Sequence, residues 1–264
     1  MNPDGSGLPP GLFVALAVVL GLVVGSFLNV CTFRWPSEES VVSPPSHCPG
    51  CGTPISWYDN IPVLSFLILR AKCRFCGAPI SPQYPIVELA SGLIWAGCFL
   101  QYGLTVESAR GAVFLTILLG IAITDARFYI IPDEFSLGGG VLGLALAPFA
   151  GGLTILEAAL GAGVGFGVLW LVAKIGTRLF KKEAMGGGDL KMMGMVGAFL
   201  GFPGVFLTLF LGALLGSVVF GPISWKTGKL VPFGIFLAAG AAVAYGWGDH
   251  LIEWYYQNFL AMPA

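Results

Sequence analysis

Long apolar runs alternate with short polar connections along most of this chain. The first run, residues 12–31 (LFVALAVVLGLVVGSFLNVC), has the length of about 20 apolar residues that a membrane-spanning helix needs. Asp4 precedes it without the basic region or cleavage site of a secretory signal, so we interpret it as a retained helix. The pattern predicts about eight spans, of which the sixth is short enough to be half of a longer broken helix. The other seven segments are 86–102, 109–126, 135–150, 154–175, 189–201, 203–222 and 231–247.

Composition supports the same fold class. The chain has 264 residues, of which 56% are hydrophobic and 10% charged, and its mean hydropathy is +0.85. These values predict an all-α polytopic membrane protein whose main partner is the lipid bilayer. A net charge of -1 provides no general basic surface, so nucleic acid is not an expected partner.

The distribution of basic residues predicts the orientation. Of the 13 lysines and arginines, all but Arg110 fall in the connections after the first, third, fifth and seventh predicted helices or at their ends. Cytoplasmic connections of membrane proteins carry an excess of lysine and arginine. We therefore expect these connections in the cytoplasm and both termini in the periplasm.

The only long hydrophilic connection, residues 32–85, contains two C-x-x-C motifs, in HCPGC and KCRFC. The motifs are 21 residues apart, which is just beyond the usual spacing of a four-cysteine zinc site. A glycine follows each motif and allows the tight turn that directs both thiolates at one ion. The candidate metal ligands are Cys48, Cys51, Cys73 and Cys76.

Two disulfides are the competing interpretation of these cysteines. A cytoplasmic loop is kept reduced, which favours metal over disulfides. Four thiolates complete a tetrahedron, so we expect a structural zinc with no open position and treat His47 as a bystander. Cys31 and Cys98 lie in apolar sequence and are interpreted as packed thiols.

An aspartate, Asp125, ends an apolar run in TDARFYIIPDEF. It lies at the C-terminal end of a predicted helix, where the helix dipole favours positive charge. A solvated interfacial carboxylate near Arg127 is one interpretation, and a functional carboxylate is the other. Asp133, which follows a proline, is interpreted as a helix N-cap.

A second aspartate, Asp189, follows three glycines in MGGGDLKMMG. An N-cap and a catalytic carboxylate explain this stretch equally well. The predicted topology places Asp125 and Asp189 at the same face of the membrane. Two carboxylates that share a site cannot both ionise easily, so one acts as a base while the other keeps its proton. The pair therefore predicts an aspartic peptidase, and the glycines would let a substrate backbone approach.

Other catalytic arrangements are poorly supported. With only His47 and His250, a serine or cysteine triad has no positioned base, and no phosphate-binding loop is present. The alternating glycines of GAGVGFG, residues 161–167, indicate close helix packing, with a groove for a substrate helix as the minority interpretation.

The chain resembles the prepilin leader peptidases, the bifunctional peptidase and N-methyltransferase family of type IV pilus and type II secretion systems. The resemblance runs through both cysteine motifs and nearly the whole chain. Its other segments are GLVVGSFLNVCTFRWP (21–36), DNIPVLSFLILR (59–70), ISPQYPIVELASG (80–92), DARFYIIPDEFS (125–136), MGGGDLKMMGMVGAFLG (185–201) and VPFGIFLAAGA (231–241).

The resemblance implies specific roles. The family's GxGD motif matches Gly186, Gly187, Gly188 and Asp189, with Lys191 beside it, and the partner aspartate maps to Asp125. The implied enzyme cleaves the basic leader of prepilins and pseudopilins after a glycine on the cytoplasmic side of the bacterial inner membrane. It would recognise the leader and the hydrophobic helix that follows it. It would then methylate the new N-terminal residue from S-adenosylmethionine.

The four cysteines are typical of the bifunctional members. The methyl-donor site is not identified, and Glu88 is the only candidate beside it, with a simple interfacial charge as an equal alternative. We expect a first membrane helix over 1–31, a methyltransferase-associated zinc loop over 32–85 and a peptidase domain over 86–264. PFGIF where PFGPF is common, and DARFYIIPD after the first aspartate, depart from the family without affecting either aspartate. A non-catalytic secretion scaffold and a proton-coupled transporter are the rival functions.

Overall fold

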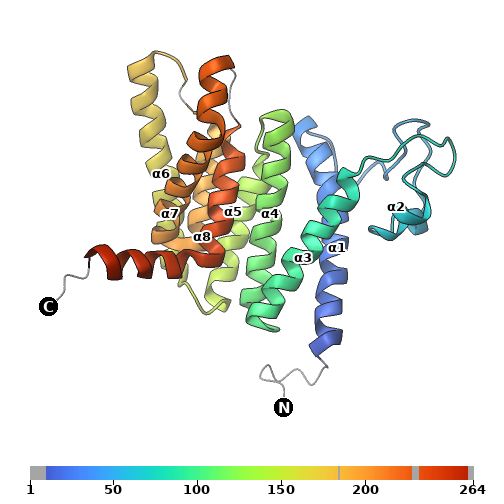
Figure 1. Ribbon diagram of the computed structural model, residues 1–264, viewed down its shortest axis with the longest axis horizontal. Helices are drawn as coiled ribbons and strands as arrows, with labels where there is room; N and C mark the ends of the chain where they lie inside the picture. The colour runs from blue at the N-terminus through green and yellow to red at the C-terminus, as the bar shows by residue number, and fades with distance from the viewer. Residues whose placement is uncertain (1–9, 184, 228–231, 261–264) are drawn as a thin grey trace. The chain divides into compact units, whose positions relative to one another are not determined.

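The structure is a computed structural model that describes residues 10–183, 185–227 and 232–260. In these ranges the chain folds into helices, and the β structure described is limited to isolated bridges (Figure 1). The helices are α1 (Pro10–Arg34), α2 (Leu64–Ile68), α3 (Gln83–Tyr102), α4 (Val106–Phe128), α5 (Asp133–Leu146), α6 (Ile155–Phe180), α7 (Gly187–Thr227) and α8 (Phe233–Tyr255). Short helical turns are η1 (Trp35–Ser37), η2 (Trp57–Asp59), η3 (Ala147–Phe149) and η4 (Tyr256–Leu260).

The predicted all-α membrane fold is confirmed, but the number of eight spans is not. Within the described residues, 5 segments are long and apolar enough to cross a membrane. Helix α5 has only 14 residues, and α3 is not among the 5. The 5 segments are Gly11–Ser37, Val106–Phe128, Ile155–Phe180, Gly187–Val219 and Phe233–Phe259.

The sixth and seventh predicted spans are both present in α7, as two helices that meet at a kink. The break lies at Gly201, which adopts φ 66° and ψ -172° and is the non-helical residue of that element. A positive φ is readily adopted only by glycine, so this residue sets the position of the break. The start of α7 and the start of α8 both lie at Ile131, so the chain has to reverse direction between them. The short sixth segment is therefore a helix of its own that ends at Gly201, and the alternative of one longer broken helix is not supported. The start of the last predicted span, at residue 231, lies outside the described residues.

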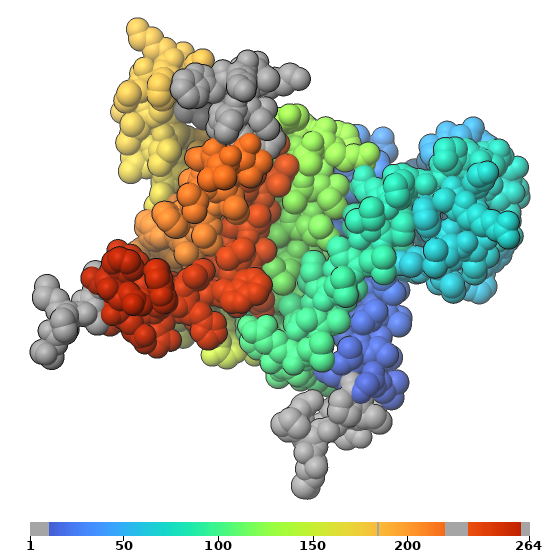
Figure 2. Space-filling view, viewed as in Figure 1, coloured from blue at the N-terminus to red at the C-terminus, as the bar shows by residue number. Residues whose placement is uncertain are grey.

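The chain forms two compact units, Met1–Thr116 and Ile117–Ala264. In unit 1, helices α1 and α3 pack closely because glycines of α1 face α3. A side chain at Gly21 would lie 2.8 Å from the Cα of Gly92, and one at Gly25 would lie 2.8 Å from the Cα of Glu88. Residues 40–80, which contain α2, form a lobe beside these two helices (Figure 2).

In unit 2, helix α7 packs against α5, α6 and α8. A side chain at Gly161 of α6 would meet the carbonyl oxygen of Gly197 in α7, and one at Gly165 would meet that of Met193. Gly163 of α6 has open space around it. The interpretation of the GAGVGFG glycines as close packing is therefore confirmed for Gly161 and Gly165, which let two helix backbones touch.

Replacing Gly161 by alanine is expected to destabilise unit 2. The added methyl group has to displace the α7 backbone, and overpacking of this kind costs about 1–3 kcal/mol. Gly163→Ala is the matched control, because it adds the same group to the same helix in open space. Thermal unfolding of the purified proteins in detergent should show a lower Tm for Gly161→Ala and an unchanged or higher Tm for the control. Equal Tm values for both variants would contradict this packing.

Candidate active site and metal cluster

The carboxylate of Asp125 lies in the last turn of α4 and is buried, with 6% of its surface exposed. Its Oδ2 atom accepts a hydrogen bond from the backbone N–H of Ile235, at 3.0 Å. Ile235 is the third residue of α8, so its N–H group is one of those that the helix itself leaves unpaired. The positive end of the α8 dipole therefore offsets the unfavourable position of this anion at the end of α4.

Two glycines and the side chain of Ile131 bring the surrounding elements close together at Asp125. A side chain at Gly234 would lie 2.9 Å from Asp125 Oδ2 and also 2.9 Å from Ile131. Ile131 lies in the connection after α4. A side chain added at Gly188 would also approach it, to 3.0 Å. The start of α7 and the start of α8 thus both contact Ile131, and only glycine fits at these two contacts.

Asp189 is the third residue of α7, which begins at Gly187. The interpretation of Asp189 as an N-cap is therefore wrong, because two residues of the helix precede it. Its charge interacts directly with that of Asp125. Gly186 lies just before the helix, where a side chain would approach Asp189 Oδ2 to 3.7 Å, whereas Gly187 has open space around it.

Lys191, two residues further along α7, forms an ion pair with Asp133 of α5, with Nζ–Oδ distances of 2.7 and 2.8 Å. Asp133 is the first residue of α5, and Pro132 occupies the N-cap without a side-chain cap. The N-cap interpretation of Asp133 is therefore wrong. The ion pair links the first turns of α5 and α7, although both side chains are partly exposed and the pair contributes little stability by itself.

Unit 2 therefore brings together both predicted aspartates. Two carboxylates within electrostatic reach of each other do not ionise together easily, so one can act as a base while the other keeps its proton. Such a pair can polarise a water molecule and protonate an amide leaving group. Sequence reasoning had not assigned Gly234 and Ile235 to this site. The signal was present in VPFGIFLAAGA, where proline and glycine begin a helix with a free N-terminal end.

In unit 1 the four predicted cysteines form one cluster. The sulfur atoms of Cys48, Cys51, Cys73 and Cys76 all lie within 4.8 Å of one another. The Sγ atoms of Cys48 and Cys76 are 3.8 Å apart, and all six cysteines of the chain are free thiols. This arrangement could hold a metal ion, and the disulfide alternative has no support. His47 is exposed and lies outside the cluster.

The two cysteine motifs adopt matching turns. Gly52 and Gly77, which follow the second cysteine of each motif, both have φ 70°. In each turn the glycine N–H donates to the carbonyl of the first cysteine, at 2.8 Å for Gly52 and 3.0 Å for Gly77. The predicted role of the two glycines is confirmed, since a positive φ is what these turns require.

Neighbouring groups shift the pKa values of the thiols in both directions: a backbone hydrogen bond from Ala78 lowers the pKa of Cys76, but burial and the neighbouring thiols raise it by more, to about 11. Hydrogen bonds from Thr53 lower the pKa of the Cys51 thiol to about 6, which favours the thiolate form that binds metals. Arg74, between the last two cysteines, makes a bidentate ion pair with Asp59 at 2.6 and 2.8 Å. The hydrogen bonds and charge of Arg74 lower the pKa of Asp59. This pair ties the second cysteine turn to η2.

Glu88 is buried in α3, and its carboxylate is held by two groups of unit 1. Its Oε2 atom accepts a hydrogen bond of 2.7 Å from the N–H of Val63, and the hydroxyl of Ser26 also bonds to it. Val63 has φ 61°, a strained conformation for a β-branched residue. A solvated interfacial charge does not describe this residue, because Glu88 connects α1, α3 and the residues before α2.

Comparisons with known proteins agree with this arrangement. Two family models match the chain, the Bacterial Peptidase A24 N-terminal domain over residues 19–102 and the Type IV leader peptidase family over residues 112–221. The first match contains the cysteine cluster and Glu88, and the second contains both aspartates. No solved structure matches the chain.

Curated relatives carry the name prepilin leader peptidase/N-methyltransferase. A protein of Myxococcus xanthus is 40% identical over 84% of this chain and 66% of its own length. Proteins of Aeromonas hydrophila and Stutzerimonas stutzeri are 33% and 35% identical over 95% and 94% of this chain, and over 96% and 95% of their own lengths. With relatives at this identity along almost its whole length and with both family models matched, this chain belongs to the type IV leader peptidase family.

Proposed function

We propose that this multi-pass membrane protein removes the leader peptides of type IV prepilins and pseudopilins after a glycine and then N-methylates the new N-terminal residue. Asp189 lies within electrostatic reach of Asp125, and the glycines beside them, Gly188 and Gly234, both pack against Ile131; this proximity supports the peptidase part of the proposal. The family membership carries the substrate class and the second reaction. Asp125 and Asp189 are the proposed catalytic residues, with Gly186, Gly187, Gly188 and Lys191 shaping their surroundings.

The two carboxylates act as a general base and a general acid. The ionised carboxylate removes a proton from a water molecule, whose oxygen attacks the carbonyl carbon of the scissile peptide bond, while the protonated carboxylate donates to the carbonyl oxygen. Collapse of the tetrahedral intermediate transfers a proton to the leaving nitrogen and breaks the C–N bond. The pair titrates as a unit, so neither aspartate is assigned one role. The open space at Gly187 offers room for an extended substrate backbone.

The cysteine cluster fits a structural zinc ion. A tetrahedral zinc ion with Zn–S bonds of about 2.3 Å places its sulfur ligands about 3.8 Å apart, which equals the separation of Cys48 and Cys76. Four thiolates leave no position for substrate, so the ion would stabilise the lobe of residues 40–80. Residues 32–85 would then be a methyltransferase-associated zinc loop between the first helix, 1–31, and a peptidase domain, 86–264.

Methyl transfer requires a donor and a deprotonated amine. S-adenosylmethionine supplies the electrophilic methyl group. The new α-amine of the pilin, after losing a proton, would attack that methyl carbon, so that the N–C bond forms as the S–C bond breaks and S-adenosylhomocysteine leaves. The distribution of lysine and arginine supports a cytoplasmic site in the bacterial inner membrane with both termini in the periplasm. The basic leader and the hydrophobic helix of the prepilin are the proposed recognition elements.

One assay tests both activities. The purified full chain is incubated with a prepilin and methyl-labelled donor, and cleavage is followed by the change in prepilin mass while label is counted in the product. We expect stoichiometric cleavage and label confined to the cleaved pilin. Intact prepilin after incubation with folded wild-type chain in native lipids would support the non-catalytic scaffold instead. Proton-coupled substrate flux in sealed vesicles, without cleavage, would support the transporter.

A further inference from the structure

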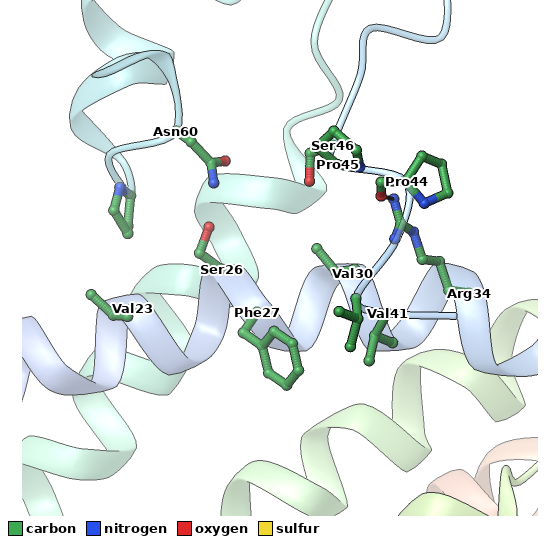
Figure 3. A pocket seen from close by; sticks show the side chains of 12 residues that line it. Val23, Ser26, Phe27, Val30, Arg34, Val41, Pro44, Pro45, Ser46 and Asn60 are labelled. Carbon is green, nitrogen blue, oxygen red and sulfur yellow. Dashed lines mark hydrogen bonds between the residues drawn. The ribbon is translucent and has the colours of Figure 1, made fainter. Parts of the chain in front are cut away.

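A pocket of about 360 Å³ lies in unit 1 between α1 and the residues that follow it (Figure 3). Pockets for small-molecule ligands usually have volumes of about 300–1,000 Å³ and combine apolar walls with a few polar groups. The pocket lining includes none of the four cysteines and neither aspartate. It is made by Val23, Ser26, Phe27, Val30 and Arg34 of α1, by Val41, Val42, Pro44, Pro45 and Ser46, and by Asn60 and Pro62.

One end of the pocket carries a fixed guanidinium group. Arg34, in the last turn of α1, donates to the carbonyl of Ser40 at 2.8 Å and to that of Pro44 at 2.7 Å. These bonds hold the group at the pocket wall, beside Pro44 in Figure 3. Arginine has further N–H groups in a planar fork that suits a carboxylate. This end therefore fits the carboxylate of an amino acid.

The opposite end presents neutral polar groups. Ser26 and Asn60 point toward one another there, and the ring of Phe27 lies between the two ends (Figure 3). Glu88 does not line the pocket, but it bonds to Ser26 and to the N–H of Val63, beside the lining residue Pro62. The buried carboxylate of Glu88 thus fixes the α1 wall and the wall of residues 60–62 relative to each other.

We propose that this pocket binds S-adenosylmethionine, which makes it the methyl-donor site of the proposed function on which this inference rests. The second family match contains both aspartates, so methyl transfer needs another site, and the pocket lies within residues 19–102. Arg34 binds the carboxylate of the donor. The face of Phe27 attracts its sulfonium charge. The amide of Asn60 pairs with the hydrogen-bonding edge of its adenine. Glu88 is a positioning residue here.

Direct binding tests this assignment. Equilibrium binding of radiolabelled S-adenosylhomocysteine to the purified full chain is measured for wild type, Val30→Phe and Val19→Phe. Val30→Phe fills the pocket and should weaken binding at least tenfold, whereas Val19→Phe adds the same ring to an exposed α1 position outside the pocket and should leave binding unchanged. Asn60→Ala should weaken binding several-fold. Leader cleavage and metal content should match wild type in all three variants, which shows that they fold.

The outcomes separate the two levels of the proposal. If Val30→Phe binds the probe as tightly as wild type does, the pocket is not the donor site; loss of a co-purifying phospholipid from that variant would identify a lipid as its occupant. If the wild-type chain cleaves prepilin but neither binds the probe nor transfers a methyl group, the methyltransferase function and the pocket are both wrong. Weak probe binding in Val30→Phe and Asn60→Ala, with wild-type binding in Val19→Phe, supports both the methyltransferase function and the pocket as its donor site.

Discussion

Asp125→Asn and Asp189→Asn are each expected to reduce the rate of leader cleavage by at least a hundredfold. General acid and base catalysis contributes a factor of about 10² to 10⁴ in rate. Each substitution replaces a carboxyl group by an amide, which can neither accept nor donate the catalytic proton. Both variants should be measured with the full chain and a prepilin under single-turnover conditions, so that product release does not mask the chemical step. Cleavage at the wild-type rate in either variant would rule out the aspartate pair.

A stability measurement distinguishes a catalytic loss from a folding defect. Asparagine keeps the volume of Asp125 and retains an oxygen that accepts from the Ile235 N–H. It also removes the repulsion between Asp125 and Asp189. The Asp125→Asn chain should therefore unfold at a temperature equal to or above that of wild type. Glu134→Gln, an exposed carboxylate in the first turn of α5, is the matched control and should cleave normally.

Replacing Cys48 and Cys76 by serine is expected to abolish metal binding. Structural zinc contributes about 10–16 kcal/mol in small zinc domains, so losing two of four thiolates should lower the metal content from about one ion per chain to nearly none. Elemental analysis of the purified protein measures this directly. The lobe of residues 40–80 should also become sensitive to trypsin, because Arg74 and Lys72 lie in the second cysteine turn.

The control for the metal experiment is Cys98→Ser, a buried thiol of α3 outside the cluster. It should retain the metal of the wild-type protein even if its unfolding temperature falls. The cluster would not be a stable metal site if carefully purified wild-type chain contained no zinc, or if the double serine variant kept its metal.

Sequence and structure agree best where chemistry depends on local spacing. The two C-x-x-C motifs with their following glycines predicted a four-thiolate cluster, because two identical short turns can direct four sulfur atoms at one point. The apolar runs predicted helices in the correct places. The number of spans was less secure, because α3 and α5 are helices that are not among the 5 segments long and apolar enough to cross a membrane.

The N-cap interpretations of Asp133 and Asp189 fail for a related reason. Helix starts are uncertain by a few residues from sequence, and α5 and α7 begin earlier than aspartate preferences indicate. Lys191, rather than a backbone N–H, is the partner described for Asp133. That partner is 58 residues away in the chain, and no local pattern predicts it.

The sequence by itself determined the fold class and the candidate site residues of this protein: an all-helical membrane chain, four clustered thiols and two aspartates at helix ends. Only the tertiary structure decided how a carboxylate is tolerated at the C-terminal end of α4. Asp125 is stabilised by the free N–H of Ile235 at the start of α8, which is 110 residues away. Helix dipoles act over about one turn, so this stabilisation exists only where packing brings the end of one helix to the beginning of another.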